Sequence, residues 1–300
     1  MDINSKSAFL LIIFAAGFFS FDASPDTFPK CDEEFLSGRS AGKVKEAAEK
    51  PVFTIISGDY QEAGYNSLKA LDYPFRKDIP VLIKPNIGGF GKKAWKEPEK
   101  IVEKVTNPAF VKGMIRFLKE KGVREIFVGE GKNVEDRGAM LKVLDVTGYA
   151  KMLEEEGVKF ADLNYYGAEG EAVPCECAGS GMLIPGIYYG MLKNGVIISA
   201  AKLKVHSFAT VSLSLKNLIG AAMFSGDKKP SLSRAKIHAE LQDYEKKKAK
   251  DAGLFAEAEA AFGKRLAEIS YLLAPDIGVI EGVRGCGGDG LTVCETEESP

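Results

Sequence analysis

The sequence predicts an α/β fold with a mainly parallel sheet flanked by helices. Short apolar segments typical of buried strands alternate along the chain with longer segments whose apolar residues recur at helical spacing. This alternation is typical of βαβ units, in which each helix returns the chain to the same end of a parallel sheet. The predicted strands are residues 52–57, 81–83, 126–128, 158–163, 196–201 and 277–280, and the predicted helices are residues 60–71, 107–122, 147–156, 232–250 and 254–273.

Two of these helices carry clear signals. Asn107 followed by Pro108 predicts a helix start, because asparagine caps the free amides of the first turn and proline fits its first position. Gly122 predicts the end of that helix. In residues 254–273 the apolar side chains fall on one stripe, which indicates a helix packed against the sheet.

The N-terminal segment differs from the rest of the chain. The uncharged apolar run from Ala8 to Phe21 has the length of a signal-peptide core and is too short to span a bilayer comfortably. We therefore expect residues 1–24 to be a signal peptide or an N-terminal anchor, with a buried or frayed helix as the alternative. The protein is exported to the periplasm or the extracellular space if residues 1–23 act as a signal, and is cytoplasmic otherwise.

The remaining chain divides into two parts. Residues 25–50 are polar and broken by prolines and glycines, so we expect a linker or a short helix. Residues 51–300 form the predicted α/β domain. Residues 164–189 are glycine-rich and aromatic, and we expect a long loop there.

Composition excludes several partners and cofactors. The formal net charge of −2 gives no overall attraction to nucleic acid, so any anion must be bound by a local cluster of cations. The five cysteines include no CxxC pair, and we expect structural cysteines or disulfides and no iron–sulfur cluster held within this chain.

Charged and amide side chains follow the predicted strands at the point where each strand ends. They are Lys84 and Asn86, then Glu130, then Lys202, Lys204 and His206, and finally Glu281 and Arg284. Ligands of open α/β sheets bind at the carboxyl edge, in the crevice where the strand order reverses. We therefore expect these side chains to share one site.

The segment 202–206 is the centre of this prediction. If the strand continues through it, Lys202, Lys204 and His206 share one face, and Leu203 and Val205 point the other way, into the protein. Two ammonium groups beside an imidazole repel one another unless an anion, a carboxylate or a metal-bound ligand compensates them.

The residues after this strand fit two structures. Val211, Leu215 and Ile219 predict the apolar face of a helix that carries Lys216, whereas the alternation over residues 211–215 fits a strand equally well.

Three further residues are interpreted one by one. Glu130 is either a general base, a metal ligand, or a turn carboxylate neutralised by Lys132. His238 lies among lysines and glutamates and is expected on a solvated face. Asp289 lies in the glycine-rich turn 285–290, which lacks the context of a dinucleotide-binding motif but suits an anion or a metal ion.

Five motifs follow one another in this order: 81–86 (VLIKPN), 129–131 (GEG), 202–206 (KLKVH), 215–220 (LKNLIG) and 276–282 (DIGVIEG). In these motifs the sequence resembles the uncharacterised family numbered 362 among domains of unknown function. The family implies no settled reaction, although many members carry a ferredoxin-like cysteine segment that this chain lacks. The family pattern continues with a proline where Leu291 stands, so we expect a domain trimmed at its C-terminus or completed from elsewhere.

Two functions follow from these residues. The first is an enzyme that binds a small anionic substrate, with or without a divalent metal ion. The second is a non-catalytic module that holds a metal, cluster or cofactor for a redox partner. The predicted catalytic residues are His206, Glu130 and Lys204, the predicted substrate-binding residues are Lys84, Asn86, Lys202, Lys216 and Asn217, and the predicted metal ligands are His206, Glu130 and Asp289.

Overall fold

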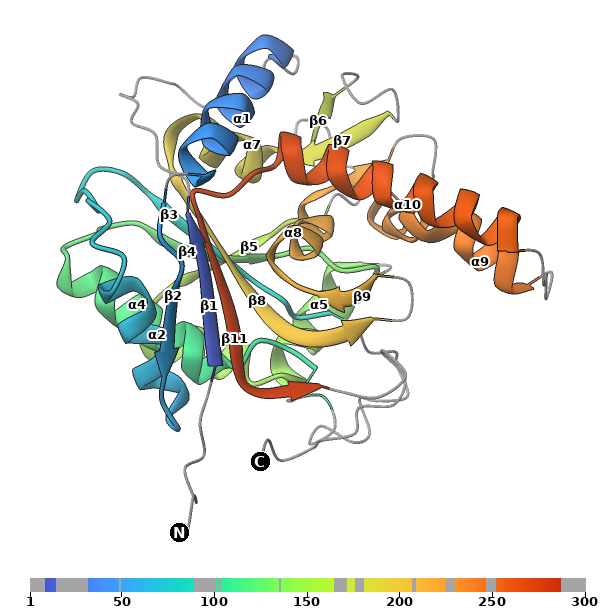
Figure 1. Cartoon of the computed structure of the whole chain (residues 1–300). Helices are drawn as coiled ribbons and strands as arrows, with labels where there is room; N and C mark the ends of the chain where they lie inside the picture. The colour runs from blue at the N-terminus through green and yellow to red at the C-terminus, as the bar shows by residue number, and fades with distance from the viewer. Residues whose placement is uncertain are drawn as a thin grey trace, which may run out of the picture.

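The computed structural model of the chain has the predicted α/β architecture, with a mainly parallel sheet between two layers of helices (Figure 1). The structure describes residues 9–14, 32–48, 50–88, 101, 104–134, 136–164, 172–175, 181–206, 209–224, 230–246 and 252–286.

Five parallel strands form the centre of the main sheet. In spatial order they are β11 (Ile277–Cys286), β8 (Val196–His206), β3 (Val81–Pro85), β4 (Ile126–Glu130) and β5 (Lys159–Asp162). On one edge, β1 (Phe9–Phe14) pairs antiparallel with both β11 and β2 (Phe53–Ile56), and β9 (Thr210–Ser212) pairs antiparallel with the end of β8.

The strand order reverses next to β3. Along the chain, β3 is followed by β4 and β5 on one side, and the later strands β8 and β11 are added on the other side. The carboxyl ends of β3 and β8 therefore flank the topological switch point, which is the place where α/β sheets bind ligands.

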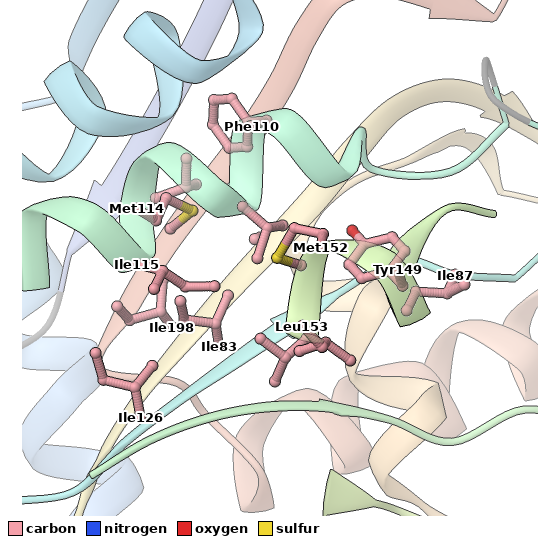
Figure 2. Packing of buried hydrophobic residues seen from close by; sticks show 14 of the residues in the cluster. Ile83, Ile87, Phe110, Met114, Ile115, Ile126, Tyr149, Met152, Leu153 and Ile198 are labelled. Atoms are coloured by element: carbon pink, nitrogen blue, oxygen red, sulfur yellow. The ribbon is translucent and has the colours of Figure 1, made fainter. Parts of the chain in front are cut away.

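One face of the sheet is covered by α2 (Tyr60–Lys69), α4 (Pro108–Glu120), α5 (Arg137–Val146) and α6 (Tyr149–Glu156). Figure 2 shows side chains of α4 and α6 packed onto the strands, with Met114 and Ile115 above Ile83 and Ile198. As the sequence predicts, Asn107 caps α4, since its side chain accepts a hydrogen bond from the Ala109 amide at 2.9 Å.

The other face is covered by α1 (Glu33–Ala48), α7 (Gly186–Asn194), α8 (Ser214–Asn217), α9 (Ala239–Lys246) and α10 (Ala252–Leu272). Two 3₁₀ helices, η2 (Leu218–Ala221) and η3 (Pro230–His238), complete this layer. A small antiparallel sheet of β6 (Ala172–Cys175), β7 (Met182–Pro185) and β10 (Met223–Phe224) lies beside them (Figure 1).

Three regions of the chain differ from the sequence-based expectations. Helix α5 was not predicted, and the expected loop 164–189 contains β6, β7 and the start of α7. These strands are only four residues long, and Val173 and Cys175 gain their burial from distant parts of the chain. The helix expected over 232–250 is divided between η3 and α9.

The segment expected as a linker or short helix contains α1, which is fixed to the domain. Arg39 and Lys43 form ion pairs with the buried carboxylate of Asp276, which also accepts a hydrogen bond from the Ile197 amide at 2.7 Å. Residues 9–14 are a strand where the alternative expectation was a helix, while export and anchoring remain predictions. No helix in the described part of the chain is both long and apolar enough to cross a membrane.

Helices α2 and α4 cross in close contact because each has a glycine at the crossing. A Cβ atom added to Gly64 would overlap the Phe110 backbone, and one added to Gly113 would overlap the Gln61 carbonyl group. The two backbones therefore pack directly against each other above the core.

We expect Gly113→Ala to lower the free energy of unfolding by about 1–3 kcal/mol, because the added methyl group must push two backbones apart. Urea unfolding followed by circular dichroism measures this loss. Gly263→Ala in α10 is the matched control, since a Cβ there meets no atom within 4 Å. The control is expected to be neutral or stabilising by up to about 1 kcal/mol, and an equal loss in both variants would contradict the crossing argument.

Candidate functional site

A buried ion pair lies at the switch point. The Lys84 ammonium group, at the end of β3, donates to Glu130 Oε1 at 2.6 Å and to Asn217 Oδ1 at 3.3 Å. Lys84 is fully buried and Glu130, at the end of β4, is nearly so. The sequence-predicted residues of β3, β4 and α8 are therefore brought together.

Further hydrogen bonds hold the two charged groups in place. Glu130 Oε2 accepts from the Ile87 amide at 2.8 Å, and Oε1 also accepts from the Gly131 amide at 2.9 Å. The Asn217 side-chain amide donates to the Lys84 carbonyl oxygen at 2.9 Å. Burial lowers the pKa of Lys84, and the adjacent Glu130 carboxylate opposes this effect.

Two glycines make room for the pair. A Cβ atom at Gly220 would overlap Glu130 Oε1 and crowd the Lys84 ammonium group, and one at Gly131 would overlap the Gly220 carbonyl oxygen. The turn after β4 and the helix after Lys216 can therefore close over the ion pair only with glycine at both positions.

A second buried ion pair joins β8 to β11. The Lys202 ammonium group lies 3.0 and 2.8 Å from the two carboxylate oxygens of Glu281, its partner in the strand register. Glu281 also accepts from the Asn107 amide at 3.3 Å, which links the pair to the start of α4. Both side chains are buried, so the charge of Lys202 is cancelled within the protein.

Lys204 is buried among neutral oxygens. Its ammonium group donates to Asn86 Oδ1 at 2.8 Å, to the Gly88 carbonyl at 3.1 Å and to the Lys104 carbonyl at 2.9 Å. These three acceptors match the three protons of an ammonium group, but none carries a negative charge. Burial, together with the Lys216 and Lys132 ammonium groups, holds the pKa of Lys204 well below its usual value.

The alternation of side chains predicted for residues 202–206 is confirmed. The prediction that Leu203 and Val205 point into the protein was wrong. Lys202, Lys204 and His206 share the buried face of β8, whereas Leu203 and Val205 are only half-buried. The charged face can point inward because Glu281 and the oxygens around Asn86 replace the water that the cations would otherwise need.

His206 and His238 stack on each other. Their ring centroids are 5.5 Å apart, and the His238 ring also stacks on Phe262 of α10 at 5.1 Å. Burial and the neighbouring Lys216 cation lower the pKa of His206 to about 3 and that of His238 to about 4. The expected solvated face for His238 was therefore wrong, because η3 packs its ring beneath α10 rather than exposing it.

The hydrogen bonding of His206 defines its tautomer. Nδ1 accepts from the Ala209 amide at 3.3 Å. In the neutral ring this assigns the proton to Nε2, which is then a donor.

Two further lysines complete the cluster, namely Lys132 and Lys216. Lys216 is partly buried and makes no hydrogen bond or ion pair within the described part of the chain. Burial lowers the pKa of Lys216 to about 8. It also lowers the pKa of Lys132 to about 8, although Glu130 opposes the shift. We refer to Lys132, Lys204, His206, Lys216 and His238 together as the basic cluster.

Arg234 was missed by sequence analysis. Its buried guanidinium group donates to Asn164 Oδ1 at 2.6 Å, to the Leu163 carbonyl at 2.7 Å and to the Gly220 carbonyl at 3.0 Å. It thereby fixes the turns that carry the basic cluster. An arginine in a serine-rich segment gives no sequence signal for such a role.

The described residues do not gather the ligands of a metal ion. No group of three histidine, cysteine or carboxylate side chains lies within that part of the chain in a position to bind one. Glu130 faces Lys84, and His206 faces other basic groups, so these two predicted ligands do not form a pair. The third predicted ligand, Asp289, lies outside the described residues, as do Cys31, Cys177 and Cys294.

The chain belongs to the family described as domain of unknown function DUF362, whose model matches residues 81–297. The matched region contains every residue of both ion pairs and of the basic cluster. No curated protein matches the sequence. A crystal structure of a protein from Thermotoga maritima aligns with 10% identity and a TM-score of 0.31, over 70% of this chain and 58% of that protein, so the alignment spans less than two thirds of its length.

We expect Glu130→Gln to lower the free energy of unfolding by about 3–5 kcal/mol, because it leaves the Lys84 charge buried without its counter-charge. The double variant Lys84→Met, Glu130→Gln is expected to lose less than the sum of the two single variants. Urea unfolding of the three variants gives the coupling energy.

Lys151→Met is the control for this cycle, since Lys151 forms only an exposed pair with Glu155 in the same helix. Its expected effect is below about 0.5 kcal/mol. Additive losses for Lys84 and Glu130 would contradict a coupled pair.

Proposed function

We propose that this protein is an enzyme whose small anionic substrate binds in the basic cluster at the carboxyl edge of the sheet. One observation carries the proposal: Lys204 is buried against neutral oxygens, its pKa is lowered by burial and by the Lys216 and Lys132 cations, and neither Lys204 nor Lys216 forms an ion pair with a carboxylate of the described residues. Bringing cations together away from water is unfavourable unless a ligand of opposite charge occupies the space between them.

In this proposal the two ion pairs hold the ends of the strands in place, and the basic cluster contacts the substrate. Lys84 and Lys202 have their charges cancelled by carboxylates, so their proposed role changes from substrate binding to holding the strand ends. Asn86 and Asn217 act in the same way, by fixing Lys204 and Lys84.

The contacts with substrate come from the remaining groups. Lys216 has ammonium protons to donate, His206 donates through Nε2, and Lys204 is held in place by its three oxygen acceptors. A neutral histidine suits this role because it donates without adding to the repulsion among the cations.

The group that transfers a proton is best sought among the lysines. Both Glu130 oxygens already accept hydrogen bonds, and the accepting nitrogen of His206 is used by Ala209. A general acid or base is most effective when its pKa lies near the working pH. The pKa values of Lys132 and Lys216, both about 8, meet this condition.

The alternative function, a metal or cluster module for a redox partner, gains no specific support. Cys175 is buried in the hydrophobic core against the second face of the sheet.

Lys216→Gln is expected to abolish stabilisation of the protein by anionic metabolites while leaving its own unfolding temperature nearly unchanged, because Lys216 has no hydrogen-bond or ion-pair partner among the described residues. A thermal-shift screen of carboxylates and phosphorylated compounds on the full chain measures this. Stabilisation follows from preferential binding to the folded state.

The control is Lys151→Gln, which removes the same charge from an exposed position. Compounds that stabilise the native protein are then incubated with it and analysed by mass spectrometry for conversion. Binding without conversion of any ligand would contradict the enzyme proposal, and equal stabilisation of the two variants would contradict the site.

A further inference from the structure

We propose that the edge of β11 is a site where two strands of this chain exchange. Residues 9–14 occupy this edge in the full chain as β1, and β2 takes their place when that segment is withdrawn, for example to act as the expected signal peptide. Three features of the sheet support the exchange: the direction of its strands, their register and the exposure of β2.

Strand β1 runs against both of its neighbours. It pairs antiparallel with β11 over residues 277–282 and antiparallel with β2 over residues 53–56. Two strands that are each antiparallel to a third run in the same direction, so β2 is parallel to β11 and to β8, β3, β4 and β5 beyond it. Without β1, therefore, β2 already has the direction needed to join the parallel part of the sheet.

The register brings β2 and β11 level with each other. Phe53 of β2 and Val279 of β11 both pair with Ile12 of β1, and the other pairs of β2 keep the same offset. To lie beside β11, β2 needs only to move sideways by one strand spacing, about 4.8 Å, without sliding along its own axis. Because the register is unchanged by such a move, Phe53 stays on the same face of the sheet as Val279.

The present position of β2 leaves one of its faces exposed. Phe53 and Ile55 pack against the core, whereas 64% of Ile56 is exposed. Helix α2 contacts β2, β1 and β11, and α1, on the other face of the sheet, contacts β1 (Figure 1). A strand in the place of β1 therefore stays beneath α2 and brings its outer face towards α1, so the exchange favours burial of Ile56.

The apolar run that contains β1 fits two environments. Residues 8–21 carry no charge, which suits both a strand between two neighbours and the core of a signal peptide, but the segment cannot be in both at once. Residues 52–56 (VFTII) are β-branched or aromatic throughout, which is the composition that strands favour. The chain thus contains a second segment suited to the edge of β11.

The test is a pair of cysteines at level positions, Thr54→Cys with Ile280→Cys, in the full chain. Both positions pair with Leu11, so with β1 between them their Cα atoms lie two strand spacings apart, roughly 9–10 Å, whereas after the exchange they lie about 4.8 Å apart. A disulfide requires a Cα separation of about 4.4–6.8 Å. The pair is therefore expected to cross-link only when β1 has left, and mass spectrometry of the linked peptides measures the yield.

Leu11→Pro releases β1, because proline removes a ladder hydrogen bond from a strand that has neighbours on both sides. In this background the yield of the 54–280 link is expected to rise at least about fivefold, since the two cysteines come within disulfide range. The melting temperature is expected to change by less than about 4 °C. Intact mass confirms that each purified chain still carries residues 1–24.

The control is Leu82→Pro in β3, which also lies between two strands but belongs to the centre of the sheet. It is expected to abolish the cooperative unfolding transition. Three results would overturn the exchange: a Leu11→Pro protein that unfolds as the control does, a folded Leu11→Pro protein without the 54–280 link, and an equal yield of the link with Leu11 unchanged. None of these results bears on anion binding by the basic cluster, which the thermal-shift screen measures separately.

Discussion

The arrangement of the candidate site depends on the buried ion pair between Lys84 and Glu130. Removing both charges from water is costly, and a single contact between them does not recover that cost. Here the carboxylate also accepts from the Ile87 and Gly131 amides, and Asn217 contacts the ammonium group. The pair therefore specifies one arrangement of β3, β4 and α8, and the absence of side chains at Gly131 and Gly220 allows the chain to close over it.

The same constraint explains which charges remain for a ligand. Because Glu130 is committed to Lys84 and Glu281 to Lys202, no described carboxylate forms an ion pair with Lys204 or Lys216. The strand order places Lys204 and Lys216 at the switch point, which is where open α/β sheets bind ligands. The lysines without ion-pair partners among the described residues therefore lie where the fold would place a ligand. The site is thus a consequence of how the charges of the strand ends are paired.

Much of the fold and several residues of the candidate site could be predicted from the sequence, because strand periodicity and the carboxyl-edge rule depend on local patterns. Lys84, Asn86, Glu130 and Lys204 were found in this way. The inward direction of Lys204 could not be predicted, because its oxygen partners come from residues 86–88 and 104, about a hundred positions earlier. The roles of Arg234 and His238 were missed for the same reason, since both act through contacts made only in the folded chain.

The charge of Lys216 is partly removed from water and has no ion-pair partner among the described residues. Its most direct test is the titration of Lys216 itself, followed by NMR of the reductively ¹³C-methylated protein, with the Lys216 signal assigned from Lys216→Arg. We expect a pKa of about 8 for Lys216 in the free protein and an increase when an anion is bound. A pKa near 10.5 that does not respond to any anion would show that Lys216 is an ordinary solvated lysine and does not belong to an anion site.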